Sequence, residues 1–449
     1  MKIPPPAGRA VAWRQAGAGR AGWLQVRCVV ASQSIDAFIS RYMRLQVRRI
    51  LSFPSAAPSR QPAAPPPAAV PPPATGARYL LYLHIPFCEE LCPYCSFNRV
   101  RLEPRLAARY FEGLRAEMRT YARLGYLFDA AYVGGGTPTV LPAELASVLR
   151  LARELWPIRS LSVETNPNHL TPQILGLLEG CGVDRLSVGV QSFDDGLLDS
   201  MHRLHRYGSG AEIRDRLAAV RGRFPTLNAD MIFNLAGQSE GMLERDLATL
   251  RELALEQVTF YPLMSPRTRR GSYARERRFY TLIRSGLGGG YLPSTAWCFS
   301  RGGKAGLIDE YIVSREEYAG LGSGSFGYLG GELYTNTFSL AGYIERARRG
   351  ELPVAATRAF TAGERLRYDF LMKLFSGRLD LDELEARHGA GAARRLWGEL
   401  AFFRAIGALR REGRVLGLTD TGNYVWVILM REFFTGVNRL RAAGLMAGE

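Results

Sequence analysis

Three cysteines lie close together in the segment HIPFCEELCPYCSFN. Cys88, Cys92 and Cys95 have the spacing C-x3-C-x2-C, and three thiolates on one tight loop can bind three irons of a cubane. The fourth iron stays open for a ligand such as an amino-carboxylate, whereas a fourth cysteine would close the cluster for electron transfer alone. A structural zinc site is the alternative, and it would need a further ligand such as Glu89, Glu90 or His84, for which the spacing is atypical. The spacing favours iron–sulfur over zinc.

The other cysteines, Cys28, Cys181 and Cys298, are scattered along the chain. Scattered single cysteines are not the framework of a small secreted disulfide protein, and they are typical of small apolar positions in a core. The cysteine pattern therefore indicates one cluster site in a reducing compartment. A cluster with an open iron is sensitive to oxygen, so an anaerobic or well-reduced cytoplasm is the expected location.

Glycines and polar residues stand where predicted strands end. VGGGTPTVL follows the strand at 130–133, and its glycines let the backbone approach a ligand while free N–H groups meet a carboxylate. Glu164 ends the next strand within SVETNP, where a carboxylate suits ribose hydroxyls. Gln191 ends the fourth strand, Arg203 follows on a helical segment, and Asp230 lies on the fifth strand. Any one of these signals is weak alone, because such residues are common in turns and on surfaces.

The ordered set of Y-x-H-I-P-F-C, GGGTPT, E-x-x-P, S-x-G-x-Q-x-F and D-x-I resembles the oxygen-independent coproporphyrinogen III oxidase family of the radical S-adenosylmethionine (SAM) superfamily. The resemblance runs from about Arg78 to about Phe360 and more loosely to the C-terminus. It implies a [4Fe–4S] cluster on Cys88, Cys92 and Cys95, with SAM bound to the open iron. One electron then cleaves SAM to methionine and a 5′-deoxyadenosyl radical, which abstracts hydrogen from the substrate.

The resemblance also implies roles for individual residues. Positions around the first SAM are Tyr82, Gly135, Glu164, Leu263 and Phe326. Positions around a second SAM, for which the family leaves room, are Gly136, Thr137, Gln191, Arg203 and Asp230. The remaining cofactor-binding positions are Tyr94 and Ile232. A second SAM would allow two hydrogen abstractions or a methyl transfer.

One position departs from the pattern of the oxidases. Those enzymes have C-x3-C-x2-C-x-C, and this chain has Phe97 at the last position, as members outside the true oxidases often do. Three functions stay open: decarboxylation of porphyrinogen propionates, methyl transfer with two SAM molecules, and heme binding by a chaperone. The first needs basic partners for carboxylates, and the third an axial ligand. Candidate basic residues are Arg267, Arg269, Arg270 and Arg301. Among the histidines, His205 fits better as part of the SAM-side RLH turn.

Composition limits the class of protein. The chain has 449 residues, 47% hydrophobic, which suffices for a large catalytic domain and a smaller second one, and no apolar run approaches the length of a membrane span. Of the net charge of +16, residues 1–77 carry +9 (ten Lys or Arg against Asp36). The basic excess therefore lies mainly outside the expected fold, so nucleic-acid binding is not expected. The expected partners are a small molecule, such as a porphyrinogen or heme, and a low-potential electron donor such as flavodoxin or ferredoxin.

The elements that position these residues alternate between strand and helix. Strands are predicted at 79–85, 130–133, 161–165, 185–190, 227–233 and 257–263, with helical patterns between them. Six such units predict a partial (β/α)6 TIM-like barrel of the radical SAM type, with function at the carboxyl ends of its strands. Residues 284–303 read as a glycine-rich loop, and 316–340 as turns and short strands. Helices are expected at 364–375 and 393–409, and a strand at 424–434.

These patterns predict five segments. We expect a basic N-terminal extension at 1–53, with one amphipathic helix near 33–53, and a Pro/Ala-rich linker at 54–77, so that the fold begins near Arg78. A radical SAM core follows at 78–265 and a family-specific continuation of the catalytic domain at 266–362. A small, mostly helical C-terminal domain occupies 363–449, with a winged-helix-like form as one option.

Overall fold

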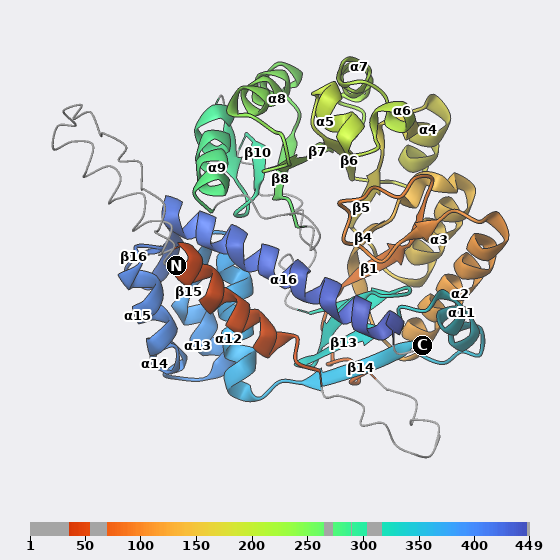
Figure 1. Ribbon diagram of the computed structural model, residues 1–449. Coiled ribbons are helices and arrows are strands. Elements are labelled where there is room, and N and C mark those ends of the chain that lie inside the picture. The colour runs from red at the N-terminus through yellow and green to blue at the C-terminus, as the bar shows by residue number, and fades with distance from the viewer. Residues whose placement is uncertain (1–35, 54–69, 265–272, 289, 303–316, 447–449) are drawn as a thin grey trace, which may run out of the picture.

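The computed structural model describes residues 36–53, 70–264, 273–288, 290–302 and 317–446. At its centre, six neighbouring strands run parallel to one another and form a curved sheet (Figure 1). They are β1 (Tyr79–Ile85), β4 (Phe128–Gly135), β5 (Ser160–Thr165), β6 (Arg185–Gln191), β7 (Thr226–Phe233) and β8 (Gln257–Pro262). Each overlaps the strand that the sequence predicts, so the partial (β/α)6 barrel is confirmed.

Helices follow the central strands and lie on the outer side of the sheet (Figure 1). They are α2 (Pro104–Arg123), α3 (Pro142–Leu155), α4 (Pro172–Gly180), α5 (Asp195–Ser200), α6 (Leu204–Tyr207), α7 (Gly210–Val220) and α8 (Glu240–Leu253). Proline stands in the first turn of α2, α3 and α4, where its missing N–H costs no helical hydrogen bond. Each helix buries one apolar stripe against the sheet, and the polar stripe faces solvent.

The sheet continues beyond both ends of the parallel part. On one side β11 (Tyr318–Leu321) pairs parallel with β1, and β12 (Phe326–Leu329), β13 (Glu332–Asn336) and β14 (Val354–Ala359) follow antiparallel. These strands confirm the turns and short strands predicted at 316–340. The helix α11 (Leu340–Arg348) leads from β13 to β14 and packs on α2.

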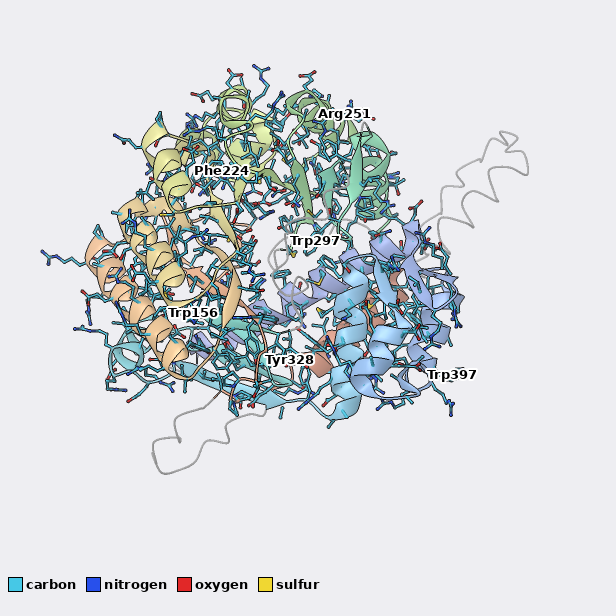
Figure 2. The ribbon with its side chains drawn as sticks, turned by 180° about the vertical axis from the view of Figure 1, so that it is seen from behind. Trp156, Phe224, Arg251, Trp297, Tyr328 and Trp397 are labelled. Carbon is cyan, nitrogen blue, oxygen red and sulfur yellow. The ribbon has the colours of Figure 1, made fainter. Side chains whose placement is uncertain are left out.

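The prediction of a loop at 284–303 is wrong for most of that segment. The helix α9 (Tyr273–Leu287) runs into it, and β9 (Tyr291–Pro293) and β10 (Cys298–Arg301) extend the sheet antiparallel from β8. Glycine content suggested a loop, but Trp297 and Cys298 are fully buried, and this burial holds the strand pair in place. Figure 2 shows Trp297 on the inner side of the ring of elements.

The C-terminal part combines four helices with a small antiparallel sheet. The helices are α12 (Ala362–Phe375), α13 (Leu381–His388), α14 (Ala392–Arg395) and α15 (Trp397–Ala405), and the sheet orders β15 (Arg378–Asp380), β17 (Val415–Leu418) and β16 (Leu409–Glu412). The last helix, α16 (Asp420–Met446), leaves this part and crosses toward the central sheet (Figure 1).

The strand predicted at 424–434 is therefore wrong, because this run lies inside α16. Residues 424–433 are buried without interruption, and a helix buried on all sides has the same continuous apolar run as a buried strand.

The expectation that the fold begins near Arg78 is also wrong. Residues 36–50 form a helix beside α16, shown in red in Figure 1. Ile39, Met43 and Val47 on its inner face are at most 2% exposed, and each such burial stabilises by about 1.5–3 kcal/mol. This helix is part of the hydrophobic core. Residues 1–35, and residues 54–69 of the expected linker, lie outside the described residues, and the domain boundaries remain predictions.

Among the described helices, none has the length and hydropathy needed to cross a membrane.

Candidate functional site

One cavity opens at the carboxyl ends of the central strands, where the ends of parallel strands meet at the same edge of the sheet. It encloses about 230 Å³. Every residue that the sequence marked for the cluster or for SAM contributes to its lining: Tyr82, Cys88, Cys92, Tyr94, Cys95, Gly135, Gly136, Thr137, Glu164, Gln191, Arg203, Asp230, Ile232, Leu263 and Phe326. The fold thus gathers residues that are up to 244 positions apart in sequence. Their individual roles remain predictions.

The cysteine loop is held in place by backbone hydrogen bonds at its base. Cys88 ends the short strand β2 (Phe87–Cys88), which pairs with β3 (Val100–Arg101) on the far side of the loop. The Cys95 amide donates to the Cys92 carbonyl over 3.2 Å, and Arg99 donates to the same carbonyl. These bonds keep the three thiols on one side of the cavity.

Two polar side chains from elsewhere in the chain reach the thiols, one after β4 and one at the start of α6. The Thr137 hydroxyl lies 3.8 Å from Cys88 Sγ, and Arg203 Nη1 lies 3.7 Å from Cys92 Sγ. Arg203 is 3% exposed, and its Nη2 donates to Asn166 Oδ1 over 2.9 Å. Arg203 therefore places a buried positive charge directly beside the cysteine loop.

The donor set fits a cluster better than a single ion. Within the described residues, no three His, Cys, Asp or Glu side chains converge as ligands of one metal ion, whereas in a cubane each thiolate binds a different iron. Burial raises the pKa of the Cys88 thiol to about 12, so the thiol needs a strong local positive charge to ionise, which the iron of a bound cluster would supply. A Cβ added to Gly136 would come 3.0 Å from Cys88 Sγ and 2.6 Å from the Phe87 carbonyl oxygen. The glycine therefore leaves the space that a cluster on this loop needs.

The glycine loop is fixed by Glu164. The Tyr132 hydroxyl donates to Glu164 Oε1 over 2.8 Å, and the Gly135 amide donates to Oε2 over 3.1 Å. A Cβ on Gly134 would come 2.6 Å from the same carboxylate. Glu164 thus lines the cavity and also holds the GGG segment at the end of β4.

Two further polar residues of the cavity wall lie on β7 and at the end of β6. Asp230 on β7 accepts hydrogen bonds of 2.8 Å from Ser187 Oγ and from Asn228 Nδ2. Gln191, at the end of β6, has a φ of +74°, a left-handed conformation that side chains other than glycine rarely adopt. Strain of this kind is common at functional sites, and here it lies in the wall of the cavity.

Sequence reasoning missed the wall that α16 supplies. Its cavity-lining residues are Phe433, Phe434, Val437, Asn438 and Arg441. Arg441 Nη1 donates to the Ser96 carbonyl over 2.9 Å and also to the Phe97 carbonyl, and the Phe97 ring meets Phe434 edge-on at 6.1 Å. The sequence did contain one indication of a helix here. The mainly apolar run continues beyond residue 434 into NRLRAAGLM, which makes it much longer than a strand and rich in Leu, Arg and Ala.

Of the four candidates for binding substrate carboxylates, Arg301 alone lies among the described residues. Arg301 lies on β10 with its guanidinium exposed, donates to the Ala254 carbonyl, and is absent from the residues that line the cavity. Arg267, Arg269 and Arg270 lie outside the described residues. The arginines that line the cavity are Arg99, Arg203 and Arg441.

Comparisons with known proteins agree with this geometry. Residues 82–250 match the family model for the radical SAM superfamily. The chain is 30% identical to the heme chaperone HemW of Bacillus subtilis, over 65% of this chain and 82% of that protein. It is 28% identical to the oxygen-independent coproporphyrinogen III oxidase of Bradyrhizobium diazoefficiens, over 70% of this chain and 77% of that protein.

The fold has a counterpart among solved structures. Coproporphyrinogen III oxidase (HemN) from Escherichia coli, described as a radical SAM enzyme, superposes with a TM-score of 0.65 at 20% identity, covering 79% of this chain and 90% of that one. The cysteine loop, the parallel strands and the similarity to these relatives lead to one conclusion: the chain belongs to the radical SAM superfamily, within the family of oxygen-independent coproporphyrinogen III oxidases and HemW-type heme chaperones.

Proposed function

We propose that this protein holds a [4Fe–4S] cluster on Cys88, Cys92 and Cys95, cleaves SAM reductively beside it, and acts on a tetrapyrrole. One observation carries the proposal: the three thiols, the strand-end residues and an aromatic wall all face a single cavity. When bound, the cluster supplies the electron that splits SAM into methionine and a 5′-deoxyadenosyl radical. A low-potential donor such as flavodoxin or ferredoxin would supply that electron.

The chain's own residues have separable tasks in this proposal. The GGG segment, held by Glu164, offers backbone groups to the amino-carboxylate end of SAM, and Tyr82 and Phe326 border the same space. Arg203 keeps positive charge beside the cluster thiols. Gly136, Thr137, Gln191 and Asp230 are the positions at which a second SAM would bind.

The proposed substrate follows from the aromatic part of the cavity lining and from the relatives. Aromatic residues line the cavity, and such surfaces suit the apolar faces of a tetrapyrrole: Phe97, Tyr261, Phe338, Phe433 and Phe434. The first proposed reaction is decarboxylation of coproporphyrinogen III. Each of two propionates would lose one hydrogen atom to the radical, CO2, and one electron to an external acceptor, and become a vinyl group.

The test is anaerobic reconstitution of the protein with iron and sulfide, followed by SAM, dithionite and coproporphyrinogen III. The expected products are 5′-deoxyadenosine, CO2 and protoporphyrinogen, measured by mass spectrometry and porphyrin fluorescence. Cleavage of SAM without decarboxylation would reject this substrate while keeping the radical chemistry. Transfer of a labelled SAM methyl group to the tetrapyrrole would instead identify a methyltransferase.

Heme chaperoning is a second candidate, favoured by Phe97 in place of the additional cysteine and by the similarity to HemW. An axial histidine inside the cavity is not readily available. Both ring nitrogens of His84, which lines the cavity, already have partners, namely the Tyr82 hydroxyl at 2.9 Å and the Asn98 carbonyl at 2.7 Å. Stoichiometric heme binding with a sharp Soret band, without SAM cleavage, would establish this function over the first.

A further inference from the structure

The C-terminal helix α16 is anchored by buried charges before it reaches the cavity. Arg431 forms an ion pair with Glu276 of α9, and both side chains are at most 6% exposed. Glu432 accepts a hydrogen bond of 2.9 Å from Arg44 and one of 3.1 Å from Ser40, both on the helix at 36–50. Breaking such a buried pair is strongly destabilising, because it leaves an uncompensated charge in the interior. The first half of α16 is thereby fixed against two other helices.

The second half of α16 is fixed at the cysteine loop. Arg441 donates to the carbonyls of Ser96 and Phe97, and Phe434 packs on Phe97. Because residues at spacings of three and four share one face of a helix, the stretch between these contacts presents a continuous face to the cavity. A helix fixed at both ends is suited to recognise a ligand, because its side chains lose little conformational entropy when the ligand binds.

Asn438 is the one neutral hydrogen-bonding side chain on this face. It is 5% exposed and lines the cavity, and within the described residues neither its Nδ2 nor its Oδ1 has a hydrogen-bond partner. A buried carboxamide without partners lowers the stability of the fold, because its atoms have lost their hydrogen bonds to water. Asn423 on the same helix is similarly buried, at 7% exposed. It differs because its Nδ2 donates a hydrogen bond to the Thr419 carbonyl over 2.9 Å.

We infer that Asn438 is a specificity-determining residue that binds the substrate through a donor and an acceptor at once. This inference rests on the proposed function for the identity of the ring. A carboxamide has one N–H2 donor group and one carbonyl acceptor, so a ligand satisfies it fully only by offering both. A porphyrinogen offers pyrrole N–H donors together with carboxylate acceptors. In heme, iron occupies the ring nitrogens and no N–H donor remains. Asn438 therefore selects the metal-free, N–H-bearing tetrapyrrole over its iron complex.

The first test needs no substrate. Asn438→Leu removes unpartnered polar atoms and keeps the side-chain size close, so it is expected to raise the Tm of the ligand-free protein by roughly 1–3 °C. Asn423→Leu is the matched control and is expected to lower the Tm, because it deletes a hydrogen bond that is made. Equal losses of Tm in both variants would show that Asn438 is structural and would overturn the inference.

The second test measures binding by anaerobic equilibrium dialysis with coproporphyrinogen III, heme and SAM as probes. Asn438→Leu is expected to weaken coproporphyrinogen binding about tenfold or more and heme binding by about threefold or less. Asn423→Leu should leave coproporphyrinogen binding at the wild-type value. Unchanged coproporphyrinogen affinity in Asn438→Leu, or an equally large fall in SAM affinity, would overturn the inference. If wild-type protein binds neither tetrapyrrole, the proposed substrate is rejected, and the Tm comparison still decides whether Asn438 is kept for a ligand.

Discussion

Tyr82 donates its phenolic hydrogen to Nδ1 of His84 across 2.9 Å. The direction of this bond follows from the other ring nitrogen, because His84 Nε2 lies 2.7 Å from the Asn98 carbonyl oxygen, which can only accept. Nε2 therefore carries the hydrogen and Nδ1 offers a lone pair. With its hydrogen engaged in this way, the Tyr82 oxygen is oriented to accept from a ligand in the cavity.

Replacing His84 tests this orientation. His84→Phe removes the acceptor, so the Tyr82 hydroxyl loses its fixed direction and SAM affinity is expected to fall about tenfold. Equilibrium dialysis with SAM measures the change, and the control is Trp397→Ala, which removes a 73% exposed ring that does not line the cavity. Nitrogen NMR of the wild-type protein should show protonated Nε2 and bare Nδ1 in His84. The opposite tautomer would refute the orientation.

The same histidine makes stability depend on pH. Burial lowers the pKa of His84 to about 4, against an ordinary value of 6.5 in the unfolded chain. Between these values the unfolded chain binds the additional proton, so stability falls as the pH drops from 6.5 to 4, by roughly 3 kcal/mol in total. Urea unfolding across this range should show the loss, and its slope should be smaller in His84→Phe. An equal slope in both proteins would assign the effect to other groups.

Loss of one cysteine should remove the intact cluster. Cys92→Ala is expected to abolish SAM cleavage and to lower iron and sulfide content after anaerobic reconstitution. Cys181→Ala is the matched control, since Cys181 is equally buried but caps the outer helix α4. A Cys92→Ala protein with a full cluster and active SAM cleavage contradicts the assignment of the three ligands.

Gly136 should tolerate no side chain. Its Cβ would come within 2.6 Å of the Phe87 carbonyl oxygen, which belongs to the backbone of the cysteine loop. Gly136→Ala is therefore expected to cost about 1–3 kcal/mol and to reduce iron content. In the control Gly176→Ala on α4, an added Cβ meets no atom within 4 Å, and stability should rise by roughly 0.5–1 kcal/mol. Chemical denaturation and iron analysis compare the two.

The helix at 36–50 should behave as part of the core. Met43 is fully buried, and Met43→Ala is expected to lower the free energy of unfolding by about 2–5 kcal/mol. Leu45 on the same helix is 48% exposed, and Leu45→Ala should change the free energy of unfolding by no more than about 0.5 kcal/mol. Equal effects of the two substitutions would mean that this helix does not pack as described.

The sequence by itself indicated the radical SAM family and the central fold. Cys88, Cys92 and Cys95 lie on one short loop, so their spacing alone indicates a shared site. The six strands could be predicted because each is a short apolar run bounded by turn residues and followed by a helical pattern. Parallel strands also bring their carboxyl ends to one edge, and for that reason Glu164, Gln191 and Asp230 could be expected near the cysteines.

Only the tertiary structure decided what closes the cavity. The run at 424–434 has no period that separates a buried strand from a buried helix, and its helical form is set by packing against elements hundreds of residues away. The sequence predicted an amphipathic helix near 33–53, but only the structure shows that its apolar residues Ile39 and Met43 are buried in the core. Contacts such as those of Arg44 with Glu432 and Arg441 with Ser96 join distant parts of the chain, and residues that far apart leave no local pattern in the sequence.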